Sequence, residues 1–132
     1  MTLPHPHLIA LRLAATVLLS CVIGQAGWAA AWLGGEPRYA AFHQVGAWVT
    51  LAVAIASAVL YVVLRRSAGA VNLGLALGVS AVVALQVALG ELGVRGPHIF
   101  LGVLLAMLAT ALTSWTYRHQ LPDATDRGVD AR

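Results

Sequence analysis

Four long apolar stretches, separated by short polar breaks, limit what this chain can fold into. They cover residues 8–33, 41–64, 71–94 and 98–117. A helix needs about 20 apolar residues to cross the ~30 Å hydrocarbon core of a bilayer, and each stretch is long enough. Because a membrane-spanning segment satisfies its backbone hydrogen bonds internally, the pattern predicts an all-α integral membrane protein, with an up-down-up-down four-helix bundle over residues 1–120.

Composition supports a membrane setting. Hydrophobic residues make up 60% of the chain and charged residues 10%, against about 45–50% apolar residues in a typical soluble domain. The eight basic residues are all arginine and lie scattered near the ends of the apolar stretches, so we expect no nucleic-acid partner. Cys21 is the single cysteine, which excludes an intramolecular disulfide and a thiolate metal cage. The main expected partner is therefore the lipid bilayer.

The arginines also predict an orientation. Four of the six near span ends lie on one side: Arg12, Arg65, Arg66 and Arg118. Only Arg38 and Arg95 lie on the other. Because cytoplasmic span ends carry the excess of arginine, we expect a multi-pass protein of the cell membrane with both termini in the cytoplasm. Residues 121–132 would form a polar cytoplasmic tail.

Aromatic residues gather toward both ends of the predicted spans. Near the outer boundary lie Trp28, Trp32, Trp48, Tyr39 and Phe42, and near the inner one lie Tyr61, Trp115 and Tyr117. Tryptophan and tyrosine are enriched where a membrane meets water. We therefore interpret both groups as interfacial belts.

The two halves of the chain share a short internal repeat. Residues 19–27 align with residues 85–93 and match at two glycines, and each segment is the outward end of a span. Each is followed by a turn and then by a histidine, His43 or His98, that opens the next span. Since the second and fourth spans run in the same direction, the two histidines are expected at similar depth near the outer face.

Two histidines at matched depth on parallel, diagonally placed helices predict the axial ligands of one six-coordinate haem, with His43 and His98 bound to its iron. Metal–imidazole bonds of about 2 Å would place the porphyrin between the helices. Glycines would give a flat macrocycle room where backbone approaches it, and the candidates are Gly24, Gly46, Gly90 and Gly102. The outward Arg38 and Arg95 would meet the anionic propionates.

Other roles for these histidines stay open on sequence alone. An interhelical polar contact would need no cofactor, and a different metal ion would have only two histidine ligands. On the predicted cytoplasmic side, His5, His7 and His119 could form a second site.

Three polar residues within the spans also have alternatives. Glu91 is the only acid in a span and could relay a proton, steady a histidine or pair with Arg95. Gln25 and Gln86 would form interhelical hydrogen bonds or contact a quinone headgroup.

The residues around the histidines resemble one half of the haem A synthase family. The likeness lies in residues 85–90, in His98 after the following turn and in His43 at the start of the second span. Members of the family contain two similar four-helix bundles, each with a pair of haem-ligating histidines, so the resemblance implies that His43 and His98 ligate a b-type haem. The family has an acidic residue three positions before its second-span histidine and an arginine directly after it, where this chain has Ala40 and Gln44. The family's loop cysteines are absent as well. The resemblance thus extends to the haem-holding half, not to hydroxylation of a haem methyl group.

Together these features predict a small b-type cytochrome of the membrane. It would transfer electrons between quinol or a redox partner and an acceptor, alone or as a subunit of a larger respiratory or redox complex, and any enzymatic role would be that of an electron-transfer component. One alternative is a cofactor-free accessory or assembly subunit that packs against other membrane subunits or a second copy. Another is a haem-handling protein related to haem A synthase.

Overall fold

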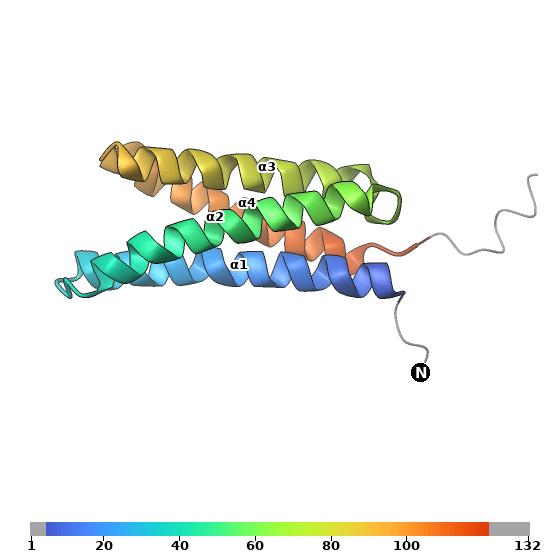
Figure 1. Cartoon of the computed structure of the whole chain (residues 1–132), viewed down its shortest axis with the longest axis horizontal. Helices are drawn as coiled ribbons and strands as arrows, with labels where there is room; N and C mark the ends of the chain where they lie inside the picture. Colours follow the sequence, from blue (N-terminus) through green and yellow to red (C-terminus); the bar gives the residue numbers. More distant parts are fainter. Residues whose placement is uncertain (1–4, 122–132) are drawn as a thin grey trace, which may run out of the picture.

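The computed structural model describes residues 5–121, and this part of the chain contains four helices and no strand. The helices are α1 (Pro6–Leu33), α2 (Tyr39–Val63), α3 (Arg65–Glu91) and α4 (Arg95–Arg118). They run side by side in alternating directions, and α1 begins at the end of the bundle where α4 stops (Figure 1). The predicted all-α four-helix bundle is confirmed. Apart from its first residue, the predicted polar tail lies outside the described residues.

Length and composition allow all four helices to cross a membrane, which makes this a multi-pass membrane protein surrounded by lipid. α4 begins at Arg95, three residues before the apolar stretch that starts at residue 98. α3 is broken at Gly69 (φ +76°, ψ 161°), so residues 64–69 form the α2–α3 turn and the continuous part of α3 begins close to the predicted residue 71. Hydropathy locates the part of a helix that sits in hydrocarbon. It does not mark where the helix ends in the polar interface.

The helices occupy the corners of a square in chain order. α1 and α3 each pack against both α2 and α4, whereas α2 and α4 make no close backbone approach. The short loops explain this order, because each helix must return beside the one before it. α2 and α4 are therefore parallel and diagonal, as the sequence predicted.

Large apolar side chains cover the outside of the bundle, and small residues make up much of its interior. Large apolar side chains such as Val45, Val63 and Met107 are about two-thirds exposed on the outside, as expected for side chains that face lipid. The interior contains many alanines, including Ala54 and Ala76, with exposures of 0% and 1%. Small interior residues allow helices to approach closely, which is how membrane helices pack.

One end of the bundle, called here the terminal end, carries the start of α1, the α2–α3 turn and the end of α4. A buried polar network joins all four helices there. The hydroxyl of Tyr61 in α2 donates to the carbonyl of Leu11 in α1 (3.1 Å). The same hydroxyl lies 2.8 Å from Thr116 Oγ1 in α4, and Thr116 Oγ1 lies 3.4 Å from Asn72 Oδ1 in α3. Tyr61 is 0% exposed, so its interpretation as a member of an interfacial belt is wrong. Its hydroxyl instead ties α2 to α1 and α4.

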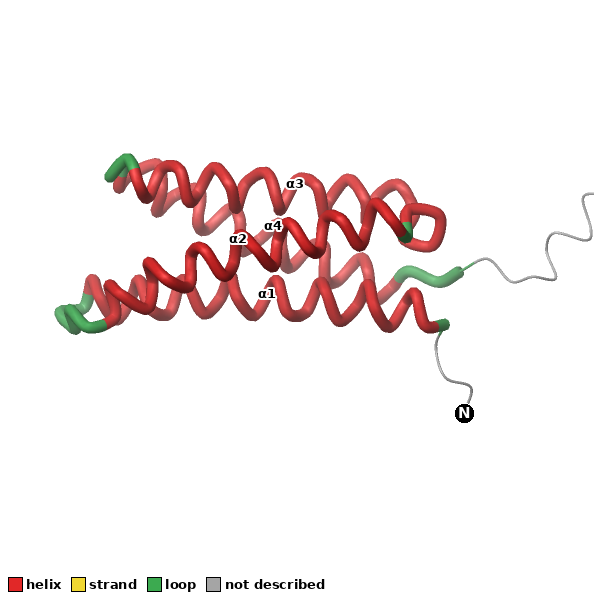
Figure 2. Tube along the Cα trace, in the orientation of Figure 1, coloured by secondary structure: helices red, strands yellow, loops and turns green. Residues whose placement is uncertain are grey.

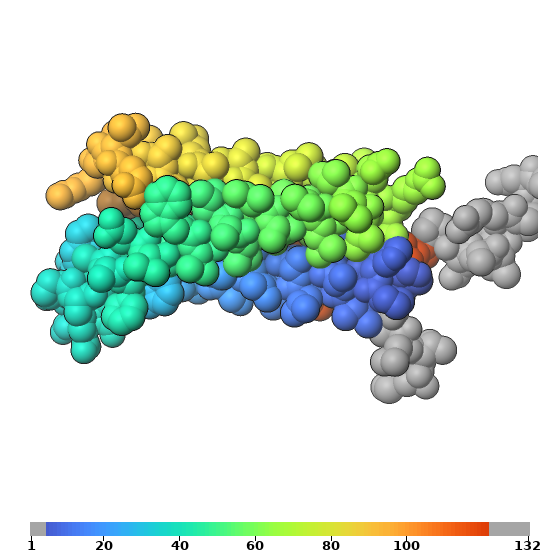
Figure 3. Space-filling model, in the orientation of Figure 1, coloured from blue at the N-terminus to red at the C-terminus, as the bar shows by residue number. Residues whose placement is uncertain are grey.

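The opposite end, called here the histidine end, carries the loops 34–38 and 92–94. The α1–α2 hairpin and the α3–α4 hairpin draw apart toward this end (Figure 2). In the space-filling view an indentation separates the start of α2 from the end of α3 (Figure 3). The two hairpins thus diverge where the candidate histidines lie.

Candidate functional site

His43 and His98 meet at the histidine end. His43 lies in the second turn of α2 and His98 in the first turn of α4, and both side chains are half-buried. Their ring centroids are 6.0 Å apart, and the ring planes are at 87° to one another. Because α2 and α4 are diagonal, this contact crosses the middle of the bundle.

Each histidine is oriented by the helix that precedes it. His43 Nδ1 lies 3.2 Å from the carbonyl oxygen of Gln25 in α1, and His98 Nδ1 lies 3.0 Å from that of Gln86 in α3. A carbonyl oxygen can only accept, so each Nδ1 is the donor. In a neutral imidazole this leaves the lone pair on Nε2. A ring nitrogen bound to a backbone carbonyl is the usual way in which proteins orient a metal-ligating histidine and fix its tautomer.

A glycine follows each histidine by about one turn and contacts the same glutamine. A Cβ at Gly46 would collide with the carboxamide of Gln25 and the ring of Trp28, and a Cβ at Gly102 would lie 2.9 Å from Gln86 Nε2. Glycine permits such close approach because it has no side chain. In each hairpin, therefore, one glutamine makes two contacts. Its side chain packs against the backbone of the glycine, and its backbone carbonyl orients the histidine.

This glutamine, histidine and glycine unit is a structural repeat that linear alignment does not find. Pairing residues 19–27 with 85–93 places Gln25 opposite Glu91, whereas the structure makes Gln25 the counterpart of Gln86. The spacing between glutamine and histidine is 18 residues in the first hairpin and 12 in the second. The signal available in the sequence was the presence of a glutamine in each span that precedes a histidine.

Three of the four polar atoms of the two carboxamides are buried without a hydrogen-bond partner in the part of the chain described. Both polar atoms of the Gln25 amide, and Gln86 Oε1, are shielded from solvent and make no hydrogen bond within residues 5–121. Leaving a buried polar atom unpaired costs about 1–3 kcal/mol. Two amides with unpaired atoms thus lie beside the two oriented imidazoles.

The separation of the two ring centroids can be compared with that of two imidazoles bound to one metal ion. Two bonds of about 2 Å to Nε2 atoms on opposite sides of an ion place the ring centroids roughly 6 Å apart. The measured separation is 6.0 Å. Among the residues described, no group of three or more histidine, cysteine, aspartate or glutamate side chains could hold a metal ion. An ion here would need its remaining ligands from a source other than those side chains, as haem iron obtains four from its porphyrin.

The four candidate glycines occupy different surroundings. Gly46 and Gly102 face the glutamines, as described above. A Cβ at Gly90 would lie 3.4 Å from His98 Cε1, which is ordinary contact, and a Cβ at Gly24 would meet nothing within 4 Å. Three of the four glycines thus adjoin the paired histidines or the glutamines that orient them, while Gly24 faces open space on α1.

The two candidate arginines are exposed at the histidine end. Arg38 Nε lies 3.6 Å from Glu36 Oε2, and its guanidinium stands over the ring of Tyr39. Arg95 is the first residue of α4. No ion pair joins it to Glu91 in the part of the chain that the structure describes. Both cations therefore lie at the end of the bundle where propionates were predicted.

The other three histidines serve the terminal end. His5 Nδ1 accepts from the backbone N–H of His7 at the start of α1. His7 Nδ1 lies 2.9 Å from Ser67 Oγ, and His119 Nε2 donates to the Ser67 carbonyl (2.9 Å). These contacts cap α1 and tie both ends of the described chain to the α2–α3 turn. They do not form a three-ligand metal site within the described residues.

Comparisons with known proteins identify no relative: no family model, no curated protein and no solved structure matches the chain. The fold and the site alone define its class, a multi-pass helical bundle with two carbonyl-oriented histidines between its hairpins.

Proposed function

We propose that this chain is a small b-type cytochrome of the membrane, in which His43 and His98 hold one haem b near the outer face. The observation that carries the proposal is the pair of imidazoles 6.0 Å apart, each with its Nδ1 hydrogen-bonded to a carbonyl of the preceding helix. In this tautomer both Nε2 atoms are available as ligands.

The number of ligands favours haem over a bare metal ion. Structural and catalytic zinc sites use three or four protein ligands, and copper sites likewise need more than two. The paired histidines supply two. A porphyrin supplies the other four nitrogens of a six-coordinate iron, so haem needs from this chain only the two side chains that it brings together.

Other residues at the histidine end suit the same group. Arg38 and Arg95 are exposed cations that would form charge-assisted hydrogen bonds with propionates. Gln25 and Gln86 carry buried amide atoms without protein partners, and hydrogen bonds to the group or to its water molecules would remove that cost.

When bound, haem supplies reversible one-electron chemistry, and the protein tunes its potential through ligands, burial and nearby charge. The chain would then exchange electrons between quinol or a membrane redox partner and an acceptor. The excess of arginine at the terminal end supports placing both termini in the cytoplasm and the histidine end outside. One haem near one face cannot carry electrons across the whole bilayer, so transfer across it would require a partner subunit or a further cofactor.

A second candidate is a cofactor-free subunit of a larger membrane complex. Gly24, Gly27 and Gly74 lie on helix surfaces where an added Cβ would meet nothing within 4 Å. Within residues 5–121 these glycines leave open space beside their helices, and glycines so placed on membrane helices allow another helix to approach closely.

Absorption spectra of the full-length protein, purified in detergent from cells supplied with haem, separate the two candidates. The cytochrome proposal predicts a Soret band and an α band after reduction with dithionite. It predicts loss of most of this absorbance in His43→Ala and in His98→Ala, but not in the control His7→Ala at the other end. Absence of the bands in the unmodified protein would leave the cofactor-free subunit. Bands that survive both site variants would refute the ligand assignment.

A further inference from the structure

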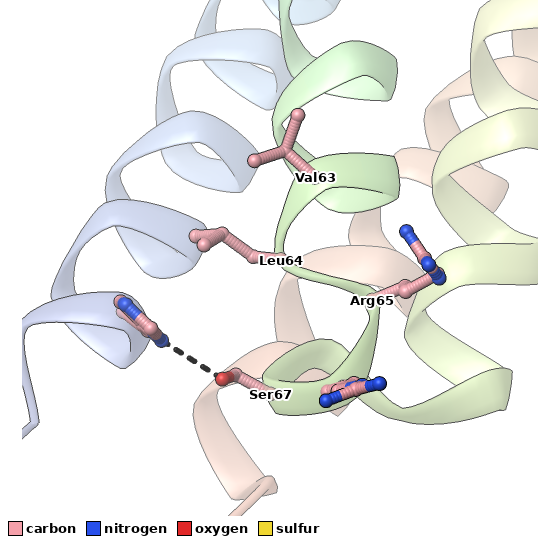
Figure 4. Close-up of a pocket in the computed structure, with 6 residues that line it drawn as sticks. Val63, Leu64, Arg65 and Ser67 are labelled. Carbon is pink, nitrogen blue, oxygen red and sulfur yellow. Dashed lines mark hydrogen bonds between the residues drawn. The ribbon is translucent and has the colours of Figure 1, made fainter.

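A recess opens at the terminal end, remote from the paired histidines. Its volume is about 240 Å³, and it lies where the first turn of α1 passes the α2–α3 turn (Figure 4). The lining residues are His7, Val63, Leu64, Arg65, Arg66 and Ser67. No role described so far uses this recess.

The recess is cationic and lacks a neutralising carboxylate in the part of the chain described. Arg65 and Arg66 are both exposed. The only acidic residues within residues 5–121 are Glu36 and Glu91, and both lie at the histidine end. Arg65 and Arg66 are consecutive in the chain, and Arg65 Nη1 donates to the Val62 carbonyl (3.4 Å), which leaves its other donors free among the residues described. Guanidinium groups are planar, forked donors of the kind that proteins use for phosphate.

The rest of the lining is partly polar and partly apolar. Ser67 Oγ and His7 Nδ1 lie 2.9 Å apart, so a hydroxyl and an imidazole stand together on one side. Val63 is 67% exposed and, with Leu64, forms the side that adjoins the membrane-spanning part of α2. An anionic group with an attached apolar chain would match both parts.

The turn that bears the arginines is held in place by its neighbours. The backbone N–H groups of Ser67 and Ala68 donate to the carbonyl of Leu64, at 2.8 Å each, and His119 Nε2 donates to the Ser67 carbonyl. Gly69 has φ +76°, and a Cβ there would lie 3.2 Å from the His119 ring. Because α1 and α4 both anchor this turn, less conformational freedom is lost when it binds a ligand.

We propose that this recess binds the phosphate headgroup of an anionic phospholipid. It lies at the end of two membrane spans, where lipid phosphates lie, and basic pockets between spans are suited to such headgroups. The exposed Val63 and the partly buried Leu64 would contact the glycerol and the start of an acyl chain, which a free phosphate ion does not possess. The recess shares no residue with the paired histidines or their glutamines.

The test measures binding of phosphatidylglycerol to the full-length protein in detergent by native mass spectrometry, with phosphatidylcholine as the reference lipid. The double variant R65Q/R66Q should weaken phosphatidylglycerol binding about 25-fold, roughly five-fold for each arginine. The single variants serve if the double variant is unstable. R118Q is the matched control, because Arg118 is exposed at the same end but lies over Trp115 and donates to the Ser114 carbonyl. It should change binding less than two-fold.

Three results would overturn the proposal. Equal binding of phosphatidylglycerol and phosphatidylcholine would show that the recess does not select an anionic headgroup. An equal loss in R118Q would assign the effect to diffuse surface charge. Displacement of phosphatidylglycerol by millimolar inorganic phosphate, with no loss in the variant Val63→Gln, would assign the site to a soluble anion.

Discussion

The contact between Gly46 and the Gln25 and Trp28 side chains gives a prediction whose size follows from the structure. Alanine at Gly46 would collide with both side chains, whereas alanine at Gly24 would meet nothing within 4 Å. Both glycines lie inside helices, so the preference of a helix for alanine, about 1 kcal/mol, acts in both variants. It therefore cancels in the difference between them, which leaves the steric cost.

Forcing an extra methyl group into a packed site costs about 1–3 kcal/mol. Gly46→Ala should thus be less stable than Gly24→Ala by about that amount. Gly102→Ala should fall between them, because its added methyl group meets only the far end of the flexible Gln86 side chain at 2.9 Å. Displacement of Gln25 should also disturb the carbonyl that orients His43, so Gly46→Ala should retain less haem.

The assay is thermal unfolding of the purified variants in one detergent, followed by tryptophan fluorescence, with the Soret absorbance per protein recorded beforehand. The expected order of stability is Gly24→Ala, then Gly102→Ala, then Gly46→Ala. Equal stability of the first and last variants would refute the close packing of Gly46 against α1, and with it the argument that glycine is needed at this position.

Three further substitutions test other parts of the structure. Tyr61→Phe removes a fully buried hydroxyl that bonds to α1 and α4, and should lower the free energy of unfolding by about 1–3 kcal/mol in the thermal assay; an unchanged midpoint would contradict the network. Gln86→Met removes a buried unpaired amide oxygen but keeps the backbone carbonyl beside His98, so the haem-free protein should unfold at an equal or higher temperature while haem is lost faster to apomyoglobin. Slower haem loss would contradict a polar role for this amide. Gly69→Ala places a side chain at φ +76° and ψ 161°, a backbone conformation essentially confined to glycine, and should lower the free energy of unfolding by about 1–3 kcal/mol, whereas Gly74→Ala, whose added methyl group meets nothing within 4 Å, should not destabilise the protein; equal unfolding midpoints would rule out strain at the α2–α3 turn.

Sequence analysis predicted the helices and the relation between the two histidines because both follow from length and order. Apolar stretches of spanning length separated by short breaks leave few arrangements other than an antiparallel bundle. In such a bundle His43 and His98 begin helices that run in the same direction. Order predicted their similar depth on diagonal helices, whereas the approach of the rings to 6.0 Å also depends on the rotation of α2 and α4 about their axes.

The partners of the histidines could not be predicted in the same way. Which residues of α1 and α3 face His43 and His98 depends on the rotation of each helix about its axis, and an almost uniformly apolar helix carries little sign of that rotation. The glutamines differ in their distance from the histidines by six residues, 18 against 12. A comparison without gaps therefore could not align Gln25 with Gln86.

Tyr61 shows the same limit at the terminal end. Its position near the end of a span favoured a place among interfacial aromatic residues, as Trp115 and Tyr117 still suggest by their exposure of 48% and 52%. Burial of Tyr61 depends on the hydrogen-bonding groups that α1 and α4 present to it. Those groups are 50 and 55 residues away in the chain, beyond the reach of a local pattern.

The account depends most on iron ligation by both histidines, and electron paramagnetic resonance of the oxidised full-length protein tests that directly. Two axial imidazoles predict a low-spin ferric signal. His43→Ala and His98→Ala should each convert it to a high-spin signal in whatever haem is retained, and added imidazole should restore the low-spin signal. His7→Ala should leave the signal unchanged. A high-spin signal in the unmodified protein, or a low-spin signal that persists in either site variant without imidazole, would contradict the account.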